Sequence, residues 1–170
     1  GMTARIWIMG TGRIAGVRTG ARVVYRHAGP ASSTVEHRRN TAGTEDFVAF
    51  DARPATEELR YRVDVSQAAG LRWVGGVLEL LDAAGVPRLR MGAPYVLDRR
   101  GERHDARVAL VGCAADRDPS GPWGRAVTPP GHPDWVVVVR WGGPADDVEY
   151  PAVVDPAWTS TTNTMTTARK

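Results

Sequence analysis

The strongest chemical pattern in the chain is the glycine-rich run GTGRIAG at Gly10–Gly16, which follows an apolar segment. The spacing Gly-x-Gly-x-x-Gly/Ala is the pattern by which a tight turn and a helix N-terminus hold a pyrophosphate group. Such a site needs a helix directly after the turn, yet Gly16 and Gly20 would interrupt that helix here. We therefore favour a connection between two strands and keep dinucleotide binding at Gly10–Gly16 as an alternative.

A nucleophilic site would need a cysteine or serine beside a histidine base that a third group orients. Cys113 could meet His104 or His132 only through the fold, and a lone cysteine is more often a small buried hydrophobe. Ser120 lacks the strand, Gly-x-Ser-x-Gly turn and helix of a hydrolase. The sequence therefore predicts a protein that is not an enzyme, with no catalytic and no cofactor-binding residues.

Three aspartates, Asp116, Asp118 and Asp134, lie in or beside a long loop rich in Pro and Gly. Their carboxylates could ligate Ca²⁺, although the spacing matches no EF-hand or nonapeptide calcium pattern. Aspartates that begin turns before Pro and Gly are the commoner explanation. The prediction is that no cofactor binds, with calcium at these three residues as the alternative.

The tryptophans offer a second kind of site, because a flat indole ring stacks on the apolar face of a sugar. Trp73, Trp135 and Trp141 lie in apolar segments and are expected in the core. Trp123 and Trp158 lie in segments rich in Pro and Gly and are expected at the surface. They are the candidate ligand-binding residues if the protein binds a glycan.

Composition favours a single β-rich domain. A chain of 170 residues can bury its own core, and 19 Gly, 12 Pro, six Trp and four Tyr favour strands and turns over helices. The net charge of +3 comes almost wholly from arginines that alternate with apolar residues, as around Tyr61. Alternation is typical of solvated strand faces, so we expect no nucleic-acid site.

Nothing in the sequence predicts insertion into a membrane. No stretch approaches the roughly 18 apolar residues that span a bilayer, and the apolar run Ile6–Met9 is too short for a signal peptide of the usual kind. Cys113 is the single cysteine and cannot close a disulfide within the chain. Cysteine usage therefore leaves the compartment open.

Strand signals recur along the chain. Apolar and polar residues alternate through Leu59–Val65, and Val77–Leu81 and Val86–Met91 flank a short turn that ends at Gly85. Further strands are expected at Ala21–Arg26, Glu45–Phe50, Tyr95–Leu97, Ala106–Val111, Trp135–Trp141 and Asp147–Val154. This rhythm predicts an all-β fold, an antiparallel β-sandwich of roughly eight to ten strands, with a closed barrel as the alternative.

Local features refine this expected sandwich. The valines of Trp135–Trp141 show no solvent face and predict a central strand, whereas Pro151 should place its strand at an edge or end it early. The segment 113–134 is expected to be a long loop. We expect one domain over residues 1–158 and a Thr-rich linker or tail over 159–170.

Two stretches resemble a known family. The strand, hairpin and Pro94–Asp98 segment within Leu59–Gly101 resemble a β-rich domain near the N-terminus of bacterial secreted proteins that continue into Kelch- or SBBP-type β-propeller repeats. Tyr150-Pro151 and Asp155-Pro156 resemble the Tyr-Pro-x-x-x-Asp-Pro signature that closes that domain, which also appears in some RHS-type surface proteins. The resemblance covers roughly Leu59–Trp158.

The resemblance implies a non-catalytic structural or interaction module of an exported protein, located outside the cell or on its surface. Its partner would be a protein or, in the carbohydrate-binding alternative, a glycan. Such relatives tend to carry a second cysteine near the valine strand, where this chain has Asp134-Trp135. The relatives supply no catalytic residues that could be carried over.

Overall fold

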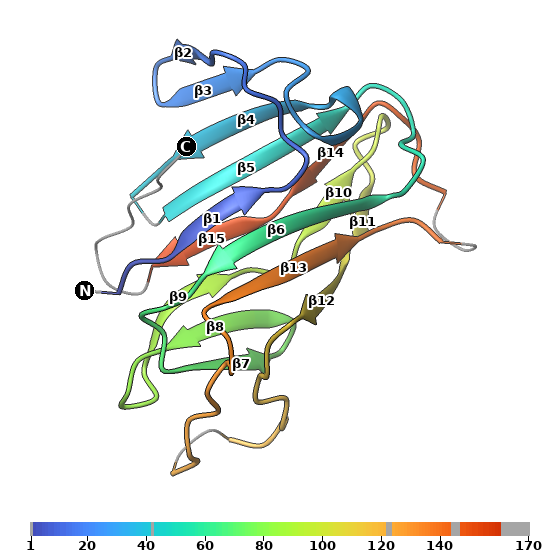
Figure 1. Cartoon of the computed structure of the whole chain (residues 1–170). Coiled ribbons are helices and arrows are strands. Elements are labelled where there is room, and N and C mark those ends of the chain that lie inside the picture. Colours follow the sequence, from blue (N-terminus) through green and yellow to red (C-terminus); the bar gives the residue numbers. More distant parts are fainter. Residues whose placement is uncertain (1, 42, 122–123, 144–146, 161–170) are drawn as a thin grey trace.

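Two antiparallel β-sheets pack face to face in the computed structural model of this chain (Figure 1). The structure describes residues 2–41, 43–121, 124–143 and 147–160. These residues contain no α-helix, only a 3₁₀ turn at Pro30–Ser32. The prediction of an all-β sandwich is confirmed, and the sheets do not close into a barrel.

The smaller sheet has four strands in the order β1-β6-β13-β12. Their bounds are Arg5–Ile8 (β1), Glu58–Asp64 (β6), Arg107–Val111 (β12) and Asp134–Arg140 (β13). The valine strand β13 pairs with β6 on one side and β12 on the other, so its predicted central place is confirmed. Leu59, Tyr61 and Val63 of β6 alternate with exposed arginines, because every second residue of a strand faces the other sheet.

The larger sheet has eleven strands and branches at β5. The main path is β11-β10-β14-β5-β15-β9-β8-β7, and β4, β3 and β2 follow one another from the opposite edge of β5. The bounds are Val17–Thr19 (β2), Arg22–Tyr25 (β3), Thr34–Arg39 (β4), Gly43–Phe50 (β5), Gly70–Val74 (β7), Val77–Leu81 (β8), Pro87–Met91 (β9), Tyr95–Leu97 (β10), Arg103–Asp105 (β11), Ala152–Asp155 (β14) and Ala157–Ser160 (β15).

The branch forms because β5 pairs with two strands along the same edge. β14 pairs with its second half, Val48–Phe50, and β15 pairs with its first half, Gly43–Glu45. The chain passes from β14 to β15 through Pro156. Gly43 permits this pairing, since a Cβ atom there would overlap the carbonyl oxygen of Trp158 and lie 2.9 Å from Cα of Thr159.

The apolar core lies where the four-stranded sheet covers the larger one. Its fully buried side chains include Leu59, Val63, Val137 and Val139 from the small sheet. Val48, Leu71, Leu78, Leu80, Met91 and Val154 are among those that the large sheet contributes. Each such side chain contributes about 1.5–3 kcal/mol when it leaves water. Strands β2, β3 and β4 extend the large sheet beyond this covered region, past the edge strand β1 (Figure 1).

Three structural expectations need correction. The described part of the chain has fifteen strands instead of eight to ten, because short strands such as β2 and β11 leave little sequence pattern. Pro151 lies just before β14, which is an inner strand between β10 and β5 and not an edge. β15 continues through Thr159 and Ser160, two residues into the predicted tail, whose remainder lies outside the described residues.

We expect Gly43→Ala to lower the free energy of unfolding by about 1–3 kcal/mol or more, because the new methyl group would collide with backbone atoms that cannot rotate away. Gly92→Ala is the matched control, since its Cβ would approach the same strand no closer than 3.9 Å. Urea unfolding followed by tryptophan fluorescence measures both variants. Equal stability of the two would contradict the close approach of β15 to β5.

Candidate functional site

A cleft of about 580 Å³ lies between edge strand β1 and the inner faces of β3, β4 and β5. Its apolar lining includes Ile6, Ile8, Ile14, Ala28, Val35 and Trp158. Its polar lining includes Arg13, Thr44 and a histidine–aspartate pair, His37 and Asp46. Clefts that bind small molecules commonly have volumes of about 300–1,000 Å³, a mainly apolar lining and a few polar groups.

Strand pairing places the polar groups on one side of the cleft. Val35 and His37 face the interior from β4, because they are two residues apart and the strand alternates its side chains. The register sets His37 opposite Asp46 and Val35 opposite Val48. Thr44 lies two residues from Asp46, and Trp158 of β15 lies opposite Thr44.

His37 and Asp46 form a cross-strand pair with Nδ1 2.7 Å from Oδ1. An ionised carboxylate only accepts hydrogen bonds, so Nδ1 of His37 carries the proton in this pair. His37 is only 8% exposed, and the aspartate fixes its ring orientation. The ring therefore presents Nε2 in a defined direction beside the cleft.

Thr44 does not complete a nucleophilic triad with this pair. Its Oγ1 lies 3.4 Å from Nδ1 and 3.5 Å from Nε2 of His37, almost equally far from both ring nitrogens. A nucleophile that His37 could deprotonate would lie in line with Nε2 and much closer to it than to Nδ1. The arrangement suits binding a ligand better than activating a hydroxyl group.

Buried polar atoms without partners lie beside this pair. Among the described residues, Nε1 of Trp158, the hydroxyl of Tyr61 and Oδ1 of Asp155 are buried and make no hydrogen bond to protein. Burial raises the pKa of Tyr61 well above its usual value, and the nearby carboxylates of Asp46 and Asp155 raise it further. Each buried polar group that has no partner costs about 1–3 kcal/mol.

The structure places the glycine-rich run of Gly10–Gly16 at the cleft, but without the geometry of a dinucleotide site. Gly12, Arg13, Ile14 and Ala15 line the cleft, and the chain then enters strand β2 instead of a helix. The N–H of Gly12 donates to the carbonyl of Ala28 at 2.7 Å and is not free for a phosphate. In the described part of the chain, no α-helix therefore begins at this run.

The three predicted calcium ligands are engaged by arginines. Asp116 and Asp118 both contact the guanidinium of Arg125, at 3.0 Å and 2.8 Å. Asp134 begins strand β13 and pairs with Arg62 on the neighbouring strand β6. Among the described residues, these three aspartates do not form a group with the spacing of metal ligands. Arginine side chains neutralise their charge.

The two predicted glycan-binding tryptophans are not found together at the surface. Trp158 is only 2% exposed, because it lies on the inner face of β15 between Thr44 and Met91, so its predicted surface position is wrong. Trp123 lies outside the described residues. Trp135 and Trp141 are buried as expected, while Trp73 is partly exposed beneath Arg117.

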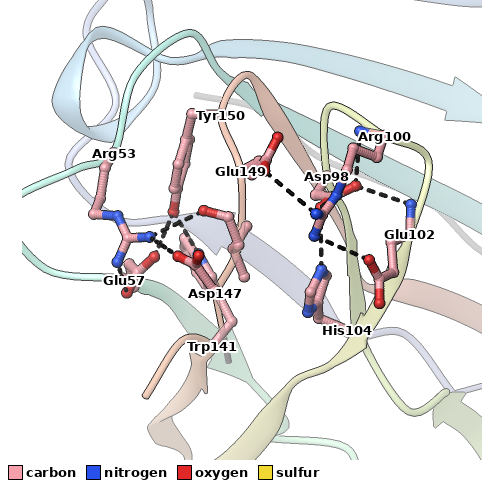
Figure 2. Close-up of polar contacts among 11 residues, drawn as sticks. Arg53, Glu57, Asp98, Arg100, Glu102, His104, Trp141, Asp147, Glu149 and Tyr150 are labelled. Atoms are coloured by element: carbon pink, nitrogen blue, oxygen red, sulfur yellow. Dashed lines mark hydrogen bonds and ion pairs between the residues drawn. The ribbon is translucent and has the colours of Figure 1, made fainter. Parts of the chain in front are cut away.

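The segment that resembles the closing signature is held by two polar networks (Figure 2). In the first, the hydroxyl of Tyr150 accepts a hydrogen bond from Nε1 of Trp141 at 2.9 Å and donates one to Glu57 at 2.8 Å. Arg53 lies over the Tyr150 ring and contacts Glu57 at 3.6 Å. Tyr150 thus ties the segment before β14 to the entry of β6 and the end of β13.

The second network surrounds Arg100, whose guanidinium contacts Glu149, Asp98 and Glu102 (Figure 2). Asp98, Glu102 and His104 bring three potential metal-ligand atoms within 4.8 Å of one another. Oδ1 of Asp98 already accepts the backbone N–H groups of Arg100 and Glu102, and these bonds form the turn between β10 and β11. Asp98 therefore has a structural role in this turn, and Arg100 neutralises the carboxylates of Asp98 and Glu102.

Asp155 of the closing signature accepts a hydrogen bond from the Tyr95 hydroxyl at 2.7 Å. This bond, with burial, raises the pKa of Tyr95 to about 12. Burial also raises the pKa of Asp155 above its usual value. Tyr150 and Asp155 thus both anchor the segment that leads into β14 and β15.

No known protein family, curated protein or solved structure matches this chain. Among the described residues no helix has the length and apolar character needed to cross a membrane. The function of the chain must therefore be argued from the residues of the cleft itself.

Sequence reasoning missed His37 and Asp46 as a pair. The strand expected at Glu45–Phe50 carries Asp46, but Thr34–Arg39 was not predicted as a strand. Val35 and His37 at alternate positions are the signal that could have found β4. Their pairing with β5 depends on register, which a single sequence does not reveal.

Replacing Tyr150 or Tyr61 by phenylalanine should change the free energy of unfolding by different amounts. Tyr150→Phe should cost about 1–3 kcal/mol, because Trp141 Nε1–H and Glu57 lose their shared partner. Tyr61→Phe should cost little or stabilise, since that hydroxyl is buried without a protein partner. Urea unfolding measures both. A Tyr61→Phe loss as large as that of Tyr150→Phe would show that a bound water or ligand holds the Tyr61 hydroxyl.

Cys113 should react slowly in the native protein. Burial raises the pKa of its thiol from 9.0 to about 11, which lowers the thiolate fraction at pH 8 about 100-fold. We expect iodoacetamide to label native Cys113 about 100-fold more slowly than the urea-unfolded chain, with a native rate that rises with pH up to about 11. Equal rates in both states would show that the thiol is not buried.

Proposed function

We propose that this domain is a non-catalytic binding module that holds a small, largely apolar molecule in the cleft between β1 and strands β3, β4 and β5. The observation that carries the proposal is the cleft of about 580 Å³, whose apolar walls surround the His37–Asp46 pair. A pocket with these contents offers the burial and the few oriented polar groups that small-molecule recognition uses.

The lack of an aligned nucleophile supports binding over catalysis. Thr44 is not in line with Nε2 of His37, and Cys113 is not among the residues that line the cleft. With the proton on Nδ1, His37 can accept one hydrogen bond from a ligand at Nε2, and no covalent bond has to form or break.

The wider setting that we propose is an interaction module of an exported bacterial surface protein, with another protein or the bound molecule as its partner. It rests on the resemblance of Leu59–Trp158 to the domain that precedes Kelch- and SBBP-type repeats. The hydrogen bonds of Tyr150 and Asp155 support it in one respect, because they give the two polar residues of the closing signature a structural role.

Glycan and dinucleotide binding have less support. The glycan alternative needs exposed indole rings, and Trp158 is buried. The dinucleotide alternative needs a helix after Gly10–Gly16, where the chain has strand β2.

The neutral fluorescent probe N-phenyl-1-naphthylamine tests the proposal, because it brightens when it leaves water for an apolar site. We expect saturable binding to the wild-type domain. Ala15→Trp should weaken binding by at least about tenfold, since Ala15 is an exposed residue in the lining of the cleft and the larger side chain would fill it.

Ala83→Trp is the matched control, because it adds the same side chain at the exposed turn between β8 and β9. It should bind the probe as the wild type does. No saturable binding to the wild type, or equal loss in both variants, would overturn the proposed function.

A further inference from the structure

One arginine lies in the lining of the cleft without an acidic partner. Arg13 lines the cleft, and it contacts no carboxylate among the described residues. Several other exposed arginines are paired; Arg60 and Arg140, for example, both contact Glu58, whereas Arg5, Arg26 and Arg38 contact no carboxylate among the described residues. A cation left without a partner at the mouth of an apolar cleft is available to an anionic ligand.

Two more arginines lie on the same face of the sheet. Arg39 is two residues beyond His37 on β4, so it shares the inner face. Arg18 of β2 pairs with Val23 of β3, which pairs with His37. Neither Arg18 nor Arg39 contacts a carboxylate among the described residues, so the inner face beside the cleft carries uncompensated positive charge.

The single acidic residue among those that line the cleft is Asp46, and His37 engages it. A carboxylate or sulfate that entered beside Arg13 would therefore meet guanidinium donors and little opposing negative charge. Deeper in the cleft, Ile6, Ile8 and Val35 offer apolar contacts. Trp158 borders the same space, and its buried Nε1–H donor has no protein partner.

We propose that the cleft selects amphipathic anions, with Arg13 binding the anionic head group and the apolar walls holding the body of the ligand. This inference rests on the proposed function and adds the chemical class of the ligand. An alkyl or aromatic carboxylate, or the matching sulfate or phosphate monoester, has the required combination. Guanidinium groups recognise all of these oxyanions through paired N–H donors.

Displacement of N-phenyl-1-naphthylamine by a matched pair of competitors tests the inference. Decanoate and 1-decanol share an alkyl chain length and differ in the charged head. We expect decanoate to displace the probe from wild-type protein at an approximately tenfold lower concentration than 1-decanol. Added salt should reduce that advantage, because exposed charge interactions are screened.

Arg13→Gln should remove most of the preference for decanoate over 1-decanol. The readout is the ratio of the two displacing concentrations, which a change in the affinity for the probe affects equally for both competitors. Arg38→Gln is the matched control, since Arg38 is equally exposed and unpaired but faces away from the cleft, opposite Arg22 and Glu45. It should keep the wild-type preference.

The outcomes separate the two proposals. If the probe binds and the two competitors displace it equally, the anion selectivity is wrong and the binding cleft stands. If decanoate keeps its advantage in Arg13→Gln, the assignment of Arg13 is wrong. If the probe does not bind to the wild type, both proposals fail.

Discussion

The pairing of one edge of β5 with two successive strands is the constraint on which the rest of the structure depends. β14 and β15 share that edge, and the chain turns between them at Pro156. The large sheet therefore splits into a β10–β11 branch and a β9–β8–β7 branch, while β4, β3 and β2 extend from the opposite edge. Four strands of the small sheet cannot cover eleven, and the inner face beyond β1 is left open as the cleft.

Because the small sheet covers only part of the large sheet, polar side chains are tolerated in the interior beside the cleft. Beneath β6 and β13 the interior is almost wholly apolar, with valine and leucine side chains that no water reaches. Towards the cleft the same interior holds His37, Asp46 and Trp158. Unpaired buried donors reduce stability, and proteins commonly accept such costs at functional sites. The polar residues on this side of the core support the proposal that the cleft binds a ligand.

The local sequence pattern predicted the all-β fold class, but it did not predict the cleft. Alternation at Leu59–Val65 and the valines of Trp135–Trp141 predicted β6 and the central β13, because both signals depend only on which faces are buried. Trp158 was expected at the surface because its segment contains Pro151 and Pro156, whereas pairing with β5 and β9 buries it. The cleft needs β1, β4 and β5 to meet across long separations in sequence, and no local pattern encodes that register. For Gly10–Gly16 the favoured prediction of a connection between two strands is confirmed, since the run links β1 to β2, and no helix follows it as the dinucleotide alternative requires.

The three isoleucines of the chain, Ile6, Ile8 and Ile14, all line the cleft. Labelling the isoleucine δ1 and leucine δ methyl groups with ¹³C gives three isoleucine signals that report on the cleft, and the leucines of β7 and β8, which are not in its lining, serve as the reference. A titration with N-phenyl-1-naphthylamine should shift all three isoleucine signals along one saturable curve and leave Leu71, Leu78 and Leu80 in place. Unchanged isoleucine signals while the leucine signals move would show that the ligand binds elsewhere and would contradict the account given for this fold.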